Sequence, residues 1–182
     1  MKSERIILFG NPVLRQVSSP VVSFHKRLHD LLDSMRATLS SGEGGAGLAA
    51  PQISVLTRVV VLCNDDDYLE LVNPEIIGTR GETVGPEGCL SLPGYFGTVR
   101  RAEEVTVKFF NRLGEEDVVT RTGLMGRGIQ HEIDHLDGVL FIDRMEEEFV
   151  FKNKGKSKQS VKELLDLTRG KVLKNLKEVR QD

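Results

Sequence analysis

The chain has 182 residues, of which 39% are apolar and 29% charged, a composition that fits one soluble globular domain and argues against membrane-embedded and fibrous proteins. The N-terminus has only a short apolar run, residues 6–9, so it lacks the core of a signal peptide, and we expect a cytoplasmic protein without membrane contact. The net charge is −2, yet residues 151–182 hold ten Lys/Arg against four Asp/Glu, which places +6 there and −8 on the first 150 residues.

The first third of the chain predicts a long helix followed by a buried strand. The Asn-Pro pair at 11–12 is typical of the start of a short helical turn. Residues 24–40 carry Leu and Met at three- and four-residue steps, which predicts an amphipathic helix. A glycine-rich stretch at 41–52 cannot continue that helix and suits either a flexible hairpin or close approach to a ligand. The β-branched run at 58–63 predicts a buried strand, with Cys63 as a core residue.

The middle of the chain predicts further strands. Residues 69–77 read as another strand that is broken at Asn73-Pro74, where we expect an edge or a bend. Residues 103–111 and 117–122 alternate between apolar and polar side chains, so they predict a hairpin. Strands that lie around two helical segments indicate an α+β fold.

The C-terminal region reads as an addition to a domain formed by residues 1–150. A Lys/Ser/Gly-rich linker is expected at 152–160, and an apolar stripe in residues 161–179 predicts a helix that packs on the same domain. The basic face of this helix is either simply solvated or binds a polyanion such as RNA.

The strongest chemical signal is the motif H-E-x-x-H at residues 131–135. On an α-helix, His131 and His135 are one turn and about 40° apart, so both imidazoles can reach one metal ion. Glu132 lies beside that face, where it can handle a proton of a water molecule at the metal. The motif predicts a metal-dependent hydrolase, in which a third protein ligand is still required.

The third ligand is not found downstream of the motif. A His six residues after His135, as in one class of metalloproteases, is replaced by Phe141, and no acid stands about twenty residues after His135. The remaining candidate is Cys89, upstream, in a segment between Gly88 and Pro93 that we expect to be irregular. A thiolate and two imidazoles make a sound set of ligands for a transition metal.

Three blocks together resemble the peptide deformylase family: GAGLAAPQ at 45–52, EGCLSLP at 87–93 and QHEIDHLDG at 130–138. The resemblance implies antiparallel or mixed sheets around a central helix that carries the motif, with a C-terminal helix. It implies that Cys89, His131 and His135 bind the metal and that Glu132 is the general base. It also implies that Gln52 and the main-chain N–H of Leu90 stabilise the oxyanion.

The same resemblance implies an N-formylmethionyl peptide as substrate and suggests residues that contact it. The backbone of the glycine-rich block, Gly45, Ala46 and Gly47, would pair with the extended peptide. Leu124 and Gly128 would line the pocket for the methionine side chain, and Arg101 would contact residues further along the peptide. Glu87 matches a position that supports the site. Ala46 and Gly128 differ in size from the usual residues, which affects pocket size rather than the reaction.

The resemblance further implies a single divalent metal ion, Fe²⁺ in the cell, with Zn²⁺, Ni²⁺ or Co²⁺ able to replace it. The expected partners are nascent N-formylmethionyl chains, and the basic C-terminal helix suggests contact with the ribosome by a monomeric enzyme. The alternative to an enzyme is a metal-binding module that docks on ribosomes without catalysis. Glu132 and Gln52, which do not bind metal, favour the enzyme.

Overall fold

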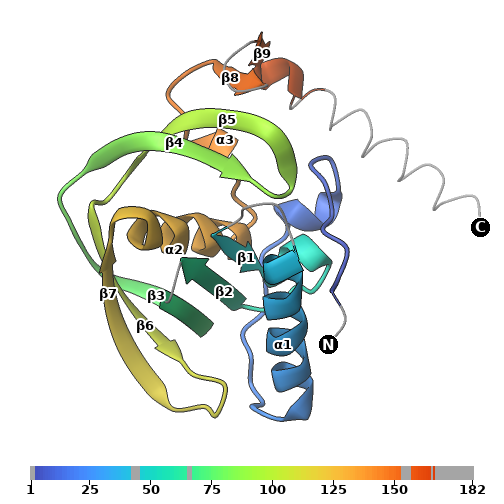
Figure 1. The fold of residues 1–182 in the computed structure, drawn as a ribbon, viewed down its shortest axis with the longest axis vertical. Coiled ribbons are helices and arrows are strands. Elements are labelled where there is room, and N and C mark those ends of the chain that lie inside the picture. Colours follow the sequence, from blue (N-terminus) through green and yellow to red (C-terminus); the bar gives the residue numbers. More distant parts are fainter. Residues whose placement is uncertain (1–2, 42–45, 65–66, 153–156, 165, 167–182) are drawn as a thin grey trace, which may run out of the picture.

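The computed structural model describes residues 3–41, 46–64, 67–152, 157–164 and 166, which form two antiparallel sheets and a few helices (Figure 1). The helical elements are η1 (Pro12–Arg15), α1 (Lys26–Ser41), η2 (Ala50–Ile53), α2 (Gly123–Leu136) and α3 (Phe141–Arg144). One sheet has the order β1 (Gly47–Ala49), β2 (Val59–Asn64), β3 (Asp67–Arg80), β6 (Glu104–Phe110), β7 (Glu116–Thr122). The other has the order β4 (Thr83–Cys89), β5 (Leu92–Arg101), β8 (Phe149–Lys152), β9 (Ser157–Ser160). The fold is therefore α+β, as expected from the sequence.

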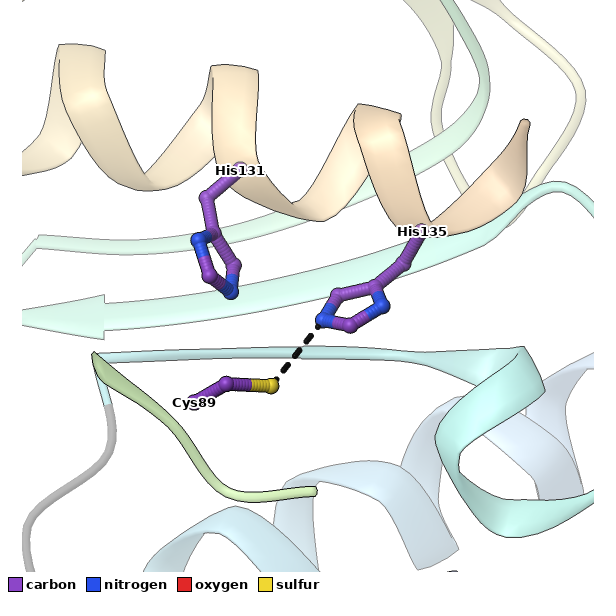
Figure 2. A group of neighbouring side chains, drawn as sticks. All are labelled: Cys89, His131 and His135. Carbon is purple, nitrogen blue, oxygen red and sulfur yellow. Dashed lines mark hydrogen bonds between the residues drawn. The ribbon is translucent and has the colours of Figure 1, made fainter. Parts of the chain in front are cut away.

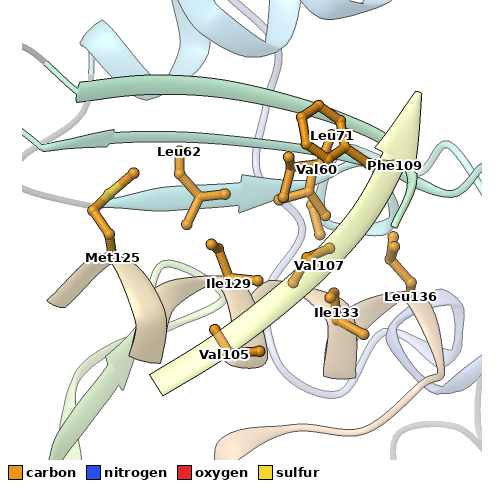
Figure 3. Close-up of a cluster of buried hydrophobic side chains, with 11 residues drawn as sticks. Val60, Leu62, Leu71, Val105, Val107, Phe109, Met125, Ile129, Ile133 and Leu136 are labelled. Carbon is orange, nitrogen blue, oxygen red and sulfur yellow. The ribbon is translucent and has the colours of Figure 1, made fainter. Parts of the chain in front are cut away.

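Helix α2 is anchored on one face of the first sheet (Figure 3). Its apolar side chains recur at three- and four-residue steps and contact strands β2 and β6; they are Met125, Ile129, Ile133 and Leu136. Fully burying a side chain of this kind stabilises the fold by roughly 1.5–3 kcal/mol. Because one stripe of α2 is fixed against the sheet, the stripe that carries His131 and His135 points away from it.

Helix α1 covers the opposite face of the same sheet near β1 and β2. Its stripe packs against Val59 and Val61 of β2, whereas Val60 and Leu62 face α2. Residues 59–62 are all fully buried because both faces of β2 are covered, which explains why the sequence reads as a continuous apolar run. The predicted helix at 24–40 is confirmed as Lys26–Ser41.

Two expectations for strands need correction. Cys63 is exposed rather than part of the core, because burial along β2 stops at Leu62. The strand at 69–77 is not broken at Asn73: β3 continues through it with a shift in register between Val72 and Glu75. Asn73 adopts a φ of 51° there, and its side chain hydrogen-bonds the backbone of Val21. The Asn-Pro pair therefore makes a bulge.

The C-terminal region also differs from the sequence prediction. Part of the expected linker, residues 157–160, is strand β9, which pairs with β8, and β8 in turn pairs with β5. Residues 161–164 are helical, and Leu164 is buried in a third apolar cluster that includes Val99 and Phe141. Most of the helix predicted at 161–179 lies outside the described residues.

Candidate metal centre

Three candidate ligands from distant parts of the sequence come together at one point (Figure 2). Among the described residues, one ligand atom from each of Cys89, His131 and His135 lies within 4.8 Å of the others. Cys89 Sγ is 3.2 Å from His135 Nε2, and the two imidazole rings meet edge to face with centroids 5.0 Å apart. This donor set fits a divalent transition metal and leaves a fourth tetrahedral position open.

Cys89 reaches the centre from the end of a strand rather than from an irregular segment. Strand β4 runs to Cys89, and a tight turn at Leu90 and Ser91 leads into β5. The register with β5 shifts between Gly88 and Cys89, and the Ser91 N–H donates to Cys89 Sγ over 3.4 Å. The turn therefore presents the sulfur toward α2.

Glu87 holds His131 in place from behind. Its Oε2 accepts a hydrogen bond from His131 Nδ1 at 2.9 Å, which leaves Nε2 for a metal. Burial alone would raise the pKa of Glu87, but hydrogen bonds from His131 and Arg101 outweigh it and lower the pKa to about 2. Glu87 is therefore a carboxylate at neutral pH and acts through His131.

The structure places Arg101 differently from the expected contact with the peptide. Its side chain is buried, with the guanidinium paired to both oxygens of Glu87 and to Asp134. The arginine on the pocket wall is Arg127, which the sequence analysis missed. Its Nη1 donates to Glu87 Oε1 at 2.9 Å and to the Val99 carbonyl at 2.9 Å. The sequence could have indicated Arg127, because it stands four residues before His131 and the two residues therefore share one face of the helix.

The pKa values of the two candidate imidazole ligands are shifted in opposite directions. Burial lowers the pKa of His135 well below its ordinary value, so this imidazole is in the neutral form that binds metals. Burial also acts to lower the pKa of His131, but hydrogen bonds to Cys89 and Glu87 outweigh it and raise the pKa. Metal binding at His131 therefore competes with a proton.

Glu132 is a buried carboxyl group that faces the pocket with an unused acceptor. It is 5% exposed, and its Oε2 has no hydrogen-bond partner among the described residues. Burial raises the pKa of Glu132 to about 7, close to the value suited to a general base near neutral pH. A Cβ on Gly47 would lie 2.6 Å from Glu132 Oε1, so glycine is needed there for the carboxyl group to fit. Such an orphaned oxygen beside three candidate metal ligands suits a water molecule or a substrate.

Gln52 presents its amide NH₂ to the same space. Its Oε1 accepts from the Ala49 N–H at 2.8 Å, and its Nε2 donates to Ser91 Oγ at 3.2 Å and to Cys89 Sγ at 3.5 Å. Because the oxygen is fixed by a backbone N–H, the amide cannot flip without losing a bond. A donor is therefore held beside the metal ligands.

A pocket of about 480 Å³ opens onto these groups, a size typical of small-ligand sites. Several of the residues expected to contact the substrate or the reacting group line it: Ala46, Gly47, Gln52, Glu87, Leu90, Leu124, Gly128 and Glu132. Gly45 lies outside the described residues. Tyr95 and Phe96 of β5 also line the pocket and were not identified from the sequence.

Comparisons with known proteins agree with this geometry. A family model described as polypeptide deformylase matches residues 3–149. A peptide deformylase of Heliobacterium modesticaldum is 48% identical over 141 residues, covering 78% of this chain and 93% of the relative. A peptide deformylase of Carboxydothermus hydrogenoformans is 44% identical over 140 residues, which cover 77% of this chain and 91% of the relative.

Solved structures give the same result. The crystal structure of the peptide deformylase from Thermotoga maritima has a TM-score of 0.78 and 37% identity, covering 81% of this chain and all of that one. The crystal structure of a peptide deformylase from Synechococcus elongatus in complex with actinonin has a TM-score of 0.79 and 34% identity. The match covers 92% of this chain and 87% of that one.

Proposed function

This chain belongs to the peptide deformylase family, and from that premise we propose which of its residues carry out the removal of the formyl group from N-formylmethionyl peptides. The observation that carries the proposal is the unpartnered Glu132 oxygen in a pocket beside Cys89, His131 and His135. Release of formate from formyl-Met-Ala-Ser by the metal-loaded protein is the direct test. A protein that bound metal without releasing formate would support the non-catalytic alternative instead.

We assign the metal to Cys89, His131 and His135. When bound there, a divalent ion supplies a Lewis acid that lowers the pKa of water toward neutrality. Glu132 accepts a proton from the water whose oxygen attacks the formyl carbon. The C–N bond then breaks, and Glu132 returns the proton to the leaving amine, which gives formate and a free N-terminal methionine.

Negative charge develops on the formyl oxygen during this reaction and needs fixed donors. The amide NH₂ of Gln52 is the side-chain donor in this proposal, and the main-chain N–H of Leu90, in the turn after Cys89, is the second. The Ala49 N–H fixes the Gln52 carbonyl and so holds the NH₂ at the site, where the formyl oxygen would replace Cys89 Sγ, 3.5 Å away, as the acceptor of one N–H.

Replacing Gln52 with alanine is expected to lower kcat about 100-fold, because one such donor is typically worth about 3 kcal/mol in the transition state. The measurement is formate release from formyl-Met-Ala-Ser, with the metal content of each preparation determined in parallel. A fully metal-loaded variant within about threefold of the wild type would remove Gln52 from the oxyanion site.

The pocket also supports the choice of substrate. Leu124 and Gly128 line the pocket, where they are placed to contact an unbranched apolar side chain. A Cβ at Gly128 would lie 3.0 Å from Cδ2 of Leu62 in the core, so this position is closely packed. Strand β1 is the edge of its sheet, so Ala46 and Gly47 can pair with an extended peptide as an added strand.

We propose Fe²⁺ as the ion in the cell, although the ligand types also accept Zn²⁺, Ni²⁺ and Co²⁺. Protein purified without oxygen is expected to lose activity within hours in air, since oxidation of the iron or of the Cys89 thiolate inactivates it. Formate release before and after exposure to air measures this, with a zinc-reloaded sample as the control. Unchanged activity in air would argue against iron.

We further propose that the enzyme is a cytoplasmic monomer in which residues 151–182 extend the catalytic domain of residues 1–150. No helix in the described part of the chain is long and apolar enough to cross a membrane. Burial of Leu164 and pairing of β8 with β5 support an extension that packs on the domain.

The basic C-terminal region is proposed to contact ribosomal RNA. Removing residues 167–182 spares Leu164 and takes away five Lys/Arg against two Asp/Glu, which weakens electrostatic binding to RNA. The truncated protein is expected to keep its rate on formyl-Met-Ala-Ser within about twofold and to lose salt-sensitive co-sedimentation with ribosomes. If the intact protein fails to co-sediment even at low salt, the basic region is simply solvated.

A further inference from the structure

The β8–β9 hairpin has no role in the function proposed above. The segment that matches the family model ends at residue 149, where β8 begins. The hairpin nevertheless extends the sheet that carries Cys89, because β8 pairs with β5 (Figure 1). Strand β5 contributes Tyr95 and Phe96 to the pocket. The hairpin is therefore close enough to the pocket wall to contact a ligand that extends out of the pocket.

The strand register places a row of side chains on one face of this sheet. Gly88 of β4 is paired with Phe96 of β5, Phe96 with Phe151 of β8, and Phe151 with Lys158 of β9. Directly paired residues point to the same side. With neighbouring strands about 4.8 Å apart, Phe151 lies about 10 Å along the row from Gly88, the residue before Cys89.

The row begins at the pocket and stays accessible beyond it. A Cβ on Gly88 would lie 2.8 Å from Phe96 Cε1, so the Phe96 ring covers Gly88, the residue before Cys89. Phe96 is nevertheless 43% exposed, and Lys158 Nζ lies 5.4 Å from the centroid of the Phe151 ring. The hairpin is held from its other face, where Val150 is fully buried. The aromatic row is thus not needed to fill the core.

We propose that Phe96 and Phe151 form an extension of the pocket that binds an apolar side chain at about the fourth residue of the formylated peptide. The occupant is the substrate itself, because the row is continuous with the pocket wall at Phe96. An extended peptide advances about 3.3 Å per residue, so about three residues span the roughly 10 Å from Gly88, which lines the pocket next to Cys89, to Phe151. This inference rests on the proposed function.

The test compares kcat/KM for formyl-Met-Ala-Ser-Phe and formyl-Met-Ala-Ser-Ser. The wild type is expected to favour the Phe peptide about fivefold, mainly through KM, since one buried apolar group gives modest discrimination. In Phe151→Thr, which keeps a strand-forming residue, the ratio is expected to fall to about one. Taking the ratio within one preparation cancels any loss of folded or metal-loaded protein.

Phe149→Thr is the matched control. Phe149 lies on the same strand and the same side as Phe151 and is 45% exposed, but it is paired with Ser160 and not with a residue of the pocket wall. The control is expected to keep the fivefold ratio. A wild-type ratio near one, or a ratio that survives Phe151→Thr, would overturn the extension while formyl-Met-Ala is still hydrolysed. Failure to hydrolyse any of these peptides would instead refute the proposed function.

Discussion

Replacing Glu132 with glutamine is expected to lower kcat for formate release by about 10²–10⁴-fold, the range typical of a general acid–base residue. Glutamine keeps the size of the side chain beside Gly47, where the space around Glu132 Oε1 is tight, but it cannot accept the proton of the attacking water. Because Glu132 does not bind the metal in this assignment, the metal content should stay at one ion per chain. The variant therefore separates proton transfer from metal binding.

The matched control is Glu116→Gln on β7, which makes the same chemical change at an exposed position. The rate of formate release should stay within about twofold of the wild type, because substitutions at exposed positions away from the site usually change stability little. If fully metal-loaded Glu132→Gln released formate within a few-fold of the wild type, the proton would have to be carried by another group.

The parts of the site that lie within one helix were the easiest to predict. The four-residue spacing of His131 and His135 fixes their geometry as soon as the segment is helical, and the apolar stripe at Ile129 and Ile133 fixes which face is buried. Cys89 lies 42 residues before His131, and no local pattern brings the two together. Elimination and the resemblance identified it, because pairing across such a distance is set by the whole fold.

The arginines show why the remainder of the site was not predictable. Arg101 and Arg127 both converge on Glu87, yet neither the burial of Arg101 nor its partners can be read from a strand sequence. Two buried charged groups, Glu87 and Arg101, and the partly buried Arg127 are tolerated because they are paired, and the pairing exists only in the folded state. The sequence analysis therefore expected a peptide contact from an arginine whose guanidinium is buried between Glu87 and Asp134, and it missed that Arg127 lines the pocket.

The β4–β5 hairpin was missed for a different reason. Its strands contain glycine and proline, including Pro86, which normally argue against a strand. Strand β4 is the edge of its sheet, where proline is tolerated. Gly88 lies under the ring of Phe96, and Gly97 lies against Met145, so these glycines allow close packing rather than breaking the strand. Such reasons appear only once the neighbours are known.

Replacing Cys89 with alanine is expected to abolish stoichiometric metal binding and, with it, formate release. Two imidazoles remain, but a tetrahedral catalytic site requires three protein ligands, and even the loss of a supporting residue such as Glu87 typically costs 10–100-fold in affinity. We therefore expect metal affinity to fall by more than about 100-fold. Competition with a chelator measures the affinity, and metal analysis of the purified protein gives the occupancy.

Cys63→Ser is the matched control, since it also removes a thiol but at an exposed position outside the group of metal ligands. Its metal content and formate release should stay close to those of the wild type. Intact folding of Cys89→Ala is checked by its unfolding transition, because Cys89 packs against the cluster around Leu140 and Phe141. A folded Cys89→Ala protein that retained one tightly bound ion would place the third ligand on another residue, and the assignment of the metal centre would have to be revised.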